Sequence, residues 1–258
     1  VFGRHSRREI YIGVKKMGLS YQEKYQVPFY ESDINQNMKL SQLLSLVLQV
    51  SGKQSLSLGM SDEYVFQTYN LVWIITEYAI EIDRLPRYTE NIVIETVPTA
   101  YNKLFCYRDF NVYGQDGEKI LTIHSTFVLM DYDTRKVHPV VDDIVDVYQV
   151  EKVKKIYRGP RYEGLENPEE TLYHVRFFDL DLNGHVNNSK YLEWMYDVLD
   201  VNFLEKYIPH HINLKYVKEV QYGHDIKSRV ERIGLTTKHE IVTQGALRAQ
   251  ARIEWKEK

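Results

Sequence analysis

Apolar residues recur at helical spacing in two stretches of the chain. These positions are Leu40, Leu43, Leu44, Val47 and Leu48 in the first stretch, and Tyr191, Trp194, Met195, Val198 and Leu199 in the second. Both sets follow the i, i+3, i+4, i+7, i+8 rule for a helix with one buried face. The pattern therefore predicts two amphipathic helices, each packed against a core.

Runs rich in apolar, β-branched and aromatic residues follow each predicted helix and predict β-strands. They cover residues 71–82, 92–97, 104–113 and 120–132 in the first half, and 212–220, 226–233, 239–243 and 246–255 in the second. One strand is also expected before each helix. This order predicts an α+β fold in which each helix packs on an antiparallel sheet, and it excludes a doubly wound fold.

The segment before each helix is repeated. Residues 25–41 (YQVPFYESDINQNMKLS) align without a gap with residues 173–189 (YHVRFFDLDLNGHVNNS). Such self-similarity indicates two structural copies of one unit. Asn37 of the first copy corresponds to His185 of the second. Since a fold needs both copies and proton-transfer chemistry needs only one, this difference directs the search for chemistry to the second copy.

The repeat divides the chain into two domains, expected at residues 18–149 and 169–258. Residues 150–168 between them are charged and contain glycine and proline, which is typical of a linker. Residues 1–17 do not follow the pattern of the two copies. They are expected to be an upstream or added segment that precedes the first copy.

Composition narrows the class of protein. A chain of 258 residues with 43% hydrophobic content can bury the cores of two domains, and a net charge of −3 does not favour nucleic acid as a partner. The chain has no apolar run of the roughly 20 residues that a membrane span needs, and no apolar signal-peptide region is seen. The single cysteine, Cys106, excludes an internal disulfide framework and a Cys-based zinc site. We expect a soluble cytoplasmic protein.

Candidate chemistry gathers at the start of the second helix. Asp181, Asn183 and His185 stand at alternate positions over a glycine-containing turn. Asn187 or Asn188 can cap the helix, which leaves backbone N–H groups and the positive end of the helix dipole beside His185. A carbonyl oxygen that gains negative charge would be stabilised there, with His185 as a proton carrier near neutral pH.

Purely structural roles can also account for several of these residues. Asp181 and Asn183 are typical of Asx turns and helix caps, and Glu219 beside lysines is typical of a solvated charge. Cys106 lies in a strand context and is expected to be a buried thiol rather than a nucleophile. No Gly-x-Ser-x-Gly, His-Glu-x-x-His or phosphate-binding glycine-rich motif occurs. Serine hydrolases, zinc proteases and nucleotide enzymes are therefore disfavoured.

Three segments together resemble one family. They are Asp181-Leu-Asn-Gly-His-Val-Asn-Asn-Ser-Lys-Tyr191, Asn70-Leu-Val-Trp-Ile-Ile75 and Tyr216-Val-Lys-Glu219. In this order they resemble the acyl-acyl carrier protein thioesterases of plants and bacteria, and the resemblance extends over nearly the whole chain from about Tyr21. It implies a double hotdog fold, in which each long helix is wrapped by its own antiparallel sheet. It also implies hydrolysis of the thioester between a fatty acyl chain and acyl carrier protein, without a cofactor or metal.

The resemblance also implies roles for particular residues. The family's catalytic residues correspond by position to Asp181, Asn183, His185 and Glu219. Plant members carry a cysteine directly after the glutamate, whereas this chain has Val220, so a thiolate mechanism at that position is excluded. We expect water to attack the thioester, with Asn183 and backbone N–H groups positioning the carbonyl and with His185 and Glu219 handling protons. Whether Asp181 orients His185 or itself attacks the carbonyl is left open.

The first copy is expected, by the same resemblance, to bind the acyl chain and to set its length. The residues expected to line the tunnel are Leu40, Leu43, Leu44, Val47, Trp73 and Ile75. Because carrier proteins are acidic, their docking surface should be basic. The densest basic cluster, which can equally be a solvated linker, is Lys152, Lys154, Lys155, Arg158 and Arg161.

Other functions stay open at this point. A hotdog acyl-CoA thioesterase would share the fold and most of the chemistry. A non-catalytic acyl-binding module would not need His185, and a hotdog dehydratase would need a hydroxyacyl substrate. Two copies in one chain can replace the dimer of single-copy relatives, so a monomer is sufficient, and a homodimer is left open.

Overall fold

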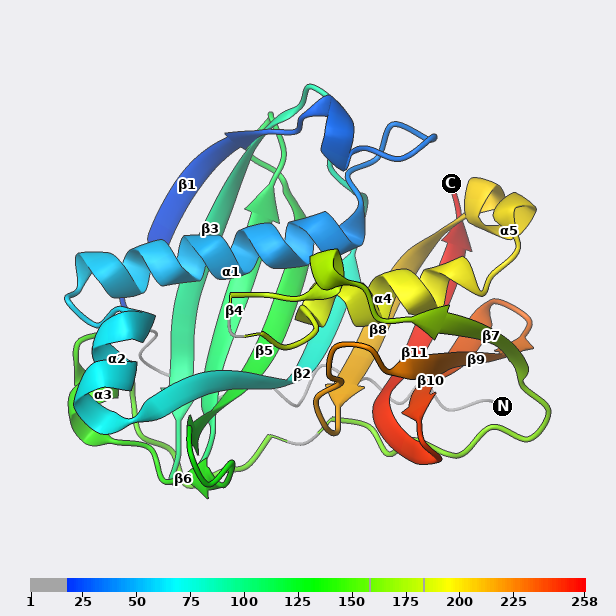
Figure 1. Ribbon diagram of the computed structural model, residues 1–258. Helices are drawn as coiled ribbons and strands as arrows, with labels where there is room; N and C mark the ends of the chain where they lie inside the picture. The colour runs from blue at the N-terminus through cyan, green and yellow to red at the C-terminus, as the bar shows by residue number, and fades with distance from the viewer. Residues whose placement is uncertain (1–17, 158, 183) are drawn as a thin grey trace, which may run out of the picture.

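The computed structural model describes residues 18–157, 159–182 and 184–258. Residues 1–17, the docking candidate Arg158 and the site candidate Asn183 therefore lie outside the described residues. The remaining chain is an α+β structure with long helices on a large antiparallel sheet, as the sequence predicted. Figure 1 shows the two copies side by side in this structure.

The first copy contains one long helix, α1 (Leu40–Ser57), between one strand and several others. Its strands are β1 (Tyr21–Gln26), β2 (Leu71–Ile82), β3 (Asn91–Tyr101), β4 (Cys106–Tyr113), β5 (Lys119–Asp131) and the short β6 (Val137–His138). Its shorter helices are the 3₁₀ turn η2 (Phe29–Glu31), α2 (Asp62–Tyr69) and α3 (Asp142–Asp146). The sequence predicted β2 with these bounds, whereas α2 and α3 were missed.

The second copy repeats this order with a shorter helix, α4 (Asn188–Asp197), which the turn η3 (Phe177–Asp179) precedes and α5 (Val201–Lys206) follows. Its strands are β7 (Glu169–His174), β8 (Tyr207–Tyr216), β9 (Asp225–Ile233), β10 (Thr236–Thr243) and β11 (Ala246–Glu257). Each element from β7 to the start of α4 occupies the positions that the gapless alignment assigns to its counterpart from β1 to α1. The sequence repeat is thus a repeat of structure.

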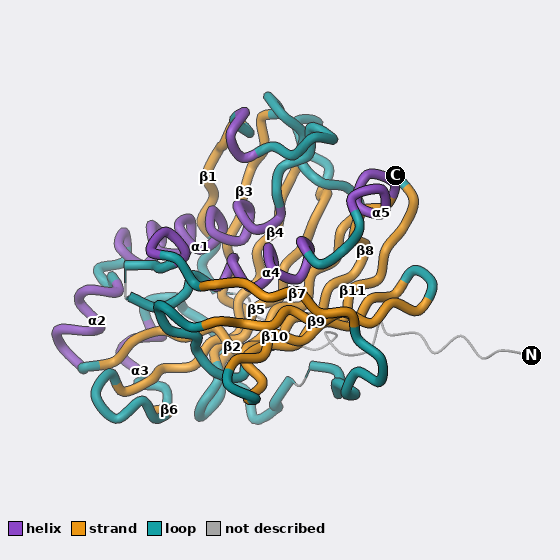
Figure 2. Tube along the Cα trace, turned by 45° about the vertical axis from the view of Figure 1, so that its right-hand side comes forward, coloured by secondary structure: helices purple, strands orange, loops and turns teal. Residues whose placement is uncertain are grey.

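One sheet runs through both copies, with strand order β1-β3-β4-β5-β2-β8-β11-β10-β9-β7 and with β6 paired to β5. The copies join where β2 and β8 pair antiparallel, with Ile80 opposite Ile212 and Tyr78 opposite Leu214. Both long helices contact one another and lie on the same face of the curved sheet, as Figure 2 also shows. A single hydrophobic core therefore continues from α1 to α4.

One predicted strand was wrong in a way that concerns the site. The sequence placed Glu219 and Val220 inside a strand, but β8 ends at Tyr216. The backbone N–H groups of Val217 and Lys218 both donate to the carbonyl of Arg248, at 2.8 and 3.2 Å. Because two successive donors use one acceptor, the regular ladder stops there. Glu219 consequently lies on the loop after the strand.

Candidate active site

A closed turn holds His185 at the entry to α4. The backbone N–H of Asp181 donates to the carbonyl of His185 at 2.8 Å, and the N–H of His185 donates to Oδ1 of Asp181 at 3.2 Å. Gly184 between them has φ +77°, which is strained for residues with a Cβ. The aspartate is thus bonded to the backbone that carries the histidine.

The first copy builds the same turn without a histidine. The N–H of Asp33 donates to the carbonyl of Asn37 at 2.8 Å, and the N–H of Asn37 donates to Oδ1 of Asp33 at 2.9 Å. Gln36 takes the left-handed position with φ +64°. The aspartate therefore supports the turn in both copies, and the imidazole of His185 is the group that the second copy adds.

The first turn of α4 follows His185 closely in the chain. Asn187 is the N-cap, and its side-chain oxygen accepts from the N–H of Ser189 at 3.0 Å and from its hydroxyl at 2.9 Å. The hydroxyl of Tyr216 donates to the carbonyl of Asn188 at 2.9 Å, which ties the first turn to β8. The dipole gives this end of the helix a partial positive charge. An anionic oxygen placed here would be stabilised.

Glu219 lies next to His185, as the family resemblance implied. Nε2 of His185 is 3.4 Å from Oε2 of Glu219, and the two side chains are 27% and 33% exposed. Tyr191 of α4 fixes the loop that carries the glutamate, since its hydroxyl accepts from the N–H of Val220 at 3.0 Å. Val186 also donates from its N–H to the carbonyl of Val220 at 3.4 Å. An imidazole and a carboxylate are therefore held together at the helix start.

The other oxygen of Glu219 is bound by an arginine from the first copy, Arg135. Arg135 lies in the turn between β5 and β6 and has φ +54°. Asp131 stabilises that turn by accepting from the N–H and the hydroxyl of Thr134, at 2.8 and 2.7 Å. The sequence reasoning missed Arg135, because no motif connects it to the second copy and only the folded chain brings it there.

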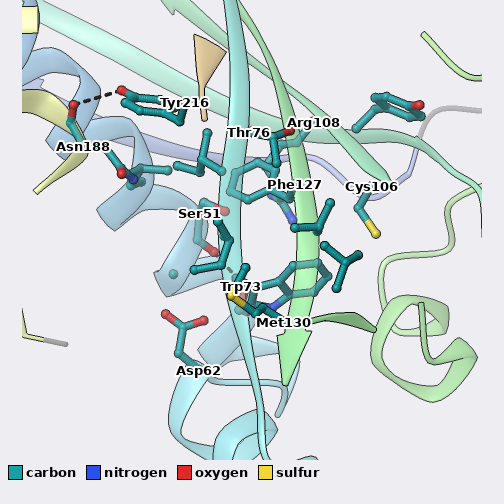
Figure 3. Close-up of a pocket in the computed structure, with 18 of the residues that line it drawn as sticks. Ser51, Asp62, Trp73, Thr76, Cys106, Arg108, Phe127, Met130, Asn188 and Tyr216 are labelled. Atoms are coloured by element: carbon teal, nitrogen blue, oxygen red, sulfur yellow. Dashed lines mark hydrogen bonds between the residues drawn. The ribbon is translucent and has the colours of Figure 1, made fainter. Parts of the chain in front are cut away.

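A cavity of about 560 Å³ connects this constellation with the first copy. Asp181, His185 and Glu219 lie on its wall, together with Trp73 and Ile75, which the sequence predicted as binding residues. Figure 3 shows Asn188 and Tyr216 on one side of the cavity, Trp73 and Phe127 in the middle, and Cys106 on the other side. A long apolar ligand can thus lie in the first copy with one end at the polar residues of the second.

The predicted face of α1 does not line the cavity. Four residues named as tunnel lining are buried in the hydrophobic core instead: Leu40, Leu43, Leu44 and Val47. The cavity is lined by a neighbouring face of α1, with Leu48, Ser51, Gly52 and Ser55. Leu48 belongs to the periodic apolar set, but the other lining residues are small or polar, and hydrophobic periodicity does not detect them.

The basic cluster in the linker is partly neutralised. Nζ of Lys152 is 2.9 Å from a carboxylate oxygen of Asp142, and the ammonium of Lys155 lies 5.2 Å from the centre of the Tyr157 ring. Lys154 and Arg161 are exposed. Docking of a carrier protein on this cluster stays a prediction.

Three further sequence expectations concern the Cys106 thiol, metal binding and membrane spans. Cys106 lines the cavity, and its burial raises the pKa of the thiol to about 12, so the sulfur stays protonated at neutral pH. Among the described residues, no group of three or more His, Cys, Asp or Glu side chains is placed to hold a metal ion. No described helix is long and apolar enough to span a membrane.

Comparison with known proteins identifies the family. Residues 18–148 match the acyl-ACP thioesterase N-terminal domain, and residues 162–257 match the acyl-ACP thioesterase C-terminal domain. Among curated proteins, the chain is 28% identical to the chloroplastic oleoyl-acyl carrier protein thioesterase of Coriandrum sativum, over 82% of this chain and 62% of that protein. It is 27% identical to oleoyl-acyl carrier protein thioesterase 1 of Arabidopsis thaliana, over 79% of this chain and 61% of that protein. The chain thus spans about three fifths of the length of these relatives.

Solved structures of thioesterases are also similar to this chain. A putative oleoyl thioesterase from Lactobacillus plantarum is similar to this chain with a TM-score of 0.88 and 33% identity, over 93% of this chain and 97% of that one. The 12:0-ACP thioesterase from Umbellularia californica shares the fold at a TM-score of 0.82 and 19% identity, over 93% and 98% of the two chains. The predicted double hotdog fold is confirmed. With both domain families matched in order, this chain belongs to the acyl-ACP thioesterase family.

Proposed function

We propose that the protein hydrolyses the thioester of fatty acyl-acyl carrier protein and releases free fatty acid, which ends elongation of that chain. The observation that carries this proposal is the continuous cavity that joins His185 and Glu219 to the interior of the first copy. The names of the relatives support the substrate class. In this proposal the partner is acyl carrier protein, which presents the acyl chain on its phosphopantetheine arm.

The geometry suits attack by water. Oε2 of Glu219 lies 3.4 Å from Nε2 of His185, and both residues line the cavity, so His185 can take a proton from the attacking water beside a carboxylate that stabilises the imidazolium. The positive end of the α4 dipole stabilises the oxyanion that forms on the carbonyl. When the C–S bond breaks, the thiolate leaves and takes up the proton that His185 carries. Because Asp181 already accepts from the backbone of His185, we assign it to holding the turn rather than to attack on the carbonyl.

Apolar walls supply the binding energy for the chain. Trp73, Ile75 and Phe127 line the cavity, and the Trp73 and Phe127 rings meet edge to face with centres 6.3 Å apart. Each methylene group transferred from water contributes about 0.8 kcal/mol. Binding in the first copy therefore places the thioester at the start of α4.

Thiol release tests the proposal. Purified protein is given acyl-carrier protein and acyl-CoA of the same chain length, and free thiol is measured over time. We expect kcat/KM to be higher for the carrier substrate. Equal or faster release from acyl-CoA would instead make the protein an acyl-CoA thioesterase. Bound fatty acid without release from either substrate would make it a binding module.

Gly52 provides a test of the position of the acyl chain. A Cβ built on this glycine meets no atom within 4 Å, although Gly52 lies inside α1 and lines the cavity. In Gly52→Leu the new side chain should occupy the space of several methylene groups. We expect the preferred acyl chain to shorten by at least two carbons, with kcat/KM for the longest accepted chain falling about tenfold for each two methylenes displaced.

Gly52→Ala is the matched control, because it adds only one methyl group. It should leave the chain-length profile nearly unchanged and should stabilise α1 by about 0.5–1 kcal/mol, which thermal unfolding can detect. An unaltered profile in a folded Gly52→Leu variant would show that the acyl chain does not pass this face of the helix.

A further inference from the structure

An irregularity in β11 brings an arginine into the interior behind the active site. Ala249 pairs with Ile241 of β10, whereas Leu247 pairs with the next residue, Val242. Arg248 therefore has no partner in β10, which makes it the extra residue of a β-bulge. Bulges change the direction of a side chain and are frequent beside active sites. Arg248 and Ala249 are both buried, although successive residues of a regular strand face opposite sides.

The loop that carries Glu219 lies against this arginine. We call residues 217–220 the Glu219 loop. The carbonyl of Arg248 accepts from the N–H groups of Val217 and Lys218, at 2.8 and 3.2 Å. Nη1 of Arg248 donates to the carbonyl of Glu219 in a long hydrogen bond of 3.5 Å. One residue of β11 thus contacts three successive residues of the Glu219 loop, by its main chain and by its side chain.

Tyr191 connects Arg248 to the electrostatics of the site. The hydroxyl of Tyr191 accepts from the N–H of Val220 at 3.0 Å, at the end of the Glu219 loop. Burial raises the pKa of this phenol to about 12, and the charge of Glu219 raises it as well. The hydrogen bond from Val220 and the charge of Arg248 act in the opposite direction. The guanidinium and the carboxylate therefore both lie near the same phenol.

Packing alone does not account for a charged residue at this position. The side chain of Arg248 is 8% exposed, and its Nε is buried without a hydrogen-bond partner. Within the part of the chain that the structure describes, no ion pair involves Arg248. A buried charge with an unsatisfied donor lowers stability relative to an apolar side chain of similar size. The contribution of Arg248 is therefore sought in the loop that it contacts.

We propose that Arg248 is a positioning residue for hydrolysis, which holds the main chain of Glu219 from the interior. The inference rests on the proposed function, because it takes Glu219 as the carboxylate that acts beside His185. Arg135 of the first copy binds the side chain of Glu219, and Arg248 of the second copy binds its carbonyl. Loss of the contact with Arg248 lets the carboxylate move away from the imidazole, which now lies 3.4 Å from it.

Arg248→Met tests this role, since methionine fills much of the same space without a charge or a donor. We expect kcat to fall about tenfold or more with little change in KM, because the acyl chain still binds while Glu219 is displaced. The temperature of thermal unfolding should stay the same or rise, because a buried charge has been removed. Arg248→Lys keeps a donor and should recover part of kcat. Unchanged kcat with a lower unfolding temperature in Arg248→Met would show a purely structural role and overturn the proposal.

Arg252→Met is the matched control on the same strand. Arg252 pairs with Glu254 at 3.2 Å, and its side chain is 43% exposed. Its replacement removes an arginine from β11 without a contact to the Glu219 loop, so kcat should not change. In the Glu219→Gln background the carboxylate is absent, and Arg248→Met should then lower kcat no further. Losses that multiply in the double variant would contradict a role through Glu219.

Hydrogen–deuterium exchange measures the same contact without a substrate. The backbone N–H groups of residues 217–220 should exchange faster in Arg248→Met, by about threefold or more, and at the wild-type rate in Arg252→Met. Equal exchange in the wild type and in Arg248→Met would overturn the proposal, whatever the outcome for hydrolysis. Faster exchange in Arg248→Met, together with a wild type that hydrolyses neither acyl-carrier protein nor acyl-CoA, would count against the proposed function and leave the contact with the loop in place.

Discussion

Replacement of His185 by asparagine is expected to lower kcat by roughly 10²–10⁴-fold while the fold is retained. Asparagine already stands at the matching position of the first copy, where Asn37 makes the same backbone hydrogen bonds to Asp33 that His185 makes to Asp181. His185→Asn therefore keeps the turn and removes only the imidazole. Steady-state hydrolysis of acyl-carrier substrate measures the loss, and thermal unfolding checks that the turn has survived.

The reciprocal change, Asn37→His, provides the matched control. Copy one carries an acidic residue, Glu81, in the segment Tyr78-Ala-Ile-Glu-Ile82, which resembles Tyr216-Val-Lys-Glu-Val220, but Glu81 is exposed near the end of β2. A histidine at position 37 should therefore add no activity, either alone or together with His185→Asn. Activity close to wild type in His185→Asn would contradict the assignment of the imidazole to proton transfer. The turn from Asp181 to His185 would then have only a structural role at the start of α4.

Much of the fold could be predicted because its signals are local. Hydrophobic periodicity identified both long helices, and the gapless repeat predicted that β7 to α4 would reproduce β1 to α1. The turn chemistry is also local, since Asp33 and Asp181 each bond to a backbone N–H four residues on. A comparison of the two copies was enough to select His185 as the added group.

The features that were missed depend on partners far along the chain. β8 ends at Tyr216, where the carbonyl of Arg248 in β11 accepts from two successive N–H groups. No sequence pattern near Glu219 predicts this end of the strand. The lining face of α1 is defined by the space left between helix and sheet rather than by its own hydrophobicity. Arg135 follows β5, and it reaches Glu219 only because the sheet places β5 one strand away from β8, with β2 between them.

Arg135→Gln is expected to lower kcat about ten- to hundredfold and to change KM little. Arg135 binds one oxygen of Glu219 while His185 lies beside the other, so the guanidinium fixes the carboxylate that orients the imidazole. Small misplacements of a catalytic group have effects of this size. Arg135→Lys should recover only part of the rate, because an ammonium lacks the planar fork of a guanidinium. Steady-state kinetics on acyl-carrier substrate measure both variants.

The free energy of unfolding should change little in Arg135→Gln. A loss of kcat in this variant would therefore reflect the position of Glu219 and not a loss of folding. The pair is about one third exposed on each side, and such ion pairs contribute about 0–1 kcal/mol to the free energy of unfolding. Arginine and glutamine carry the same backbone strain at φ +54°, so the substitution does not alter the turn. Lys136→Gln removes a neighbouring exposed cation from the same turn and should leave kcat unchanged.

A double-mutant cycle decides whether Arg135 acts through the glutamate. In the Glu219→Gln background the carboxylate is gone, so adding Arg135→Gln should lower kcat no further, and the two effects should be strongly non-additive. If the losses multiplied instead, Arg135 would be acting on the substrate or on the cavity wall. The expected result would make the active site a joint product of both copies, since the first would supply the arginine that positions the glutamate of the second.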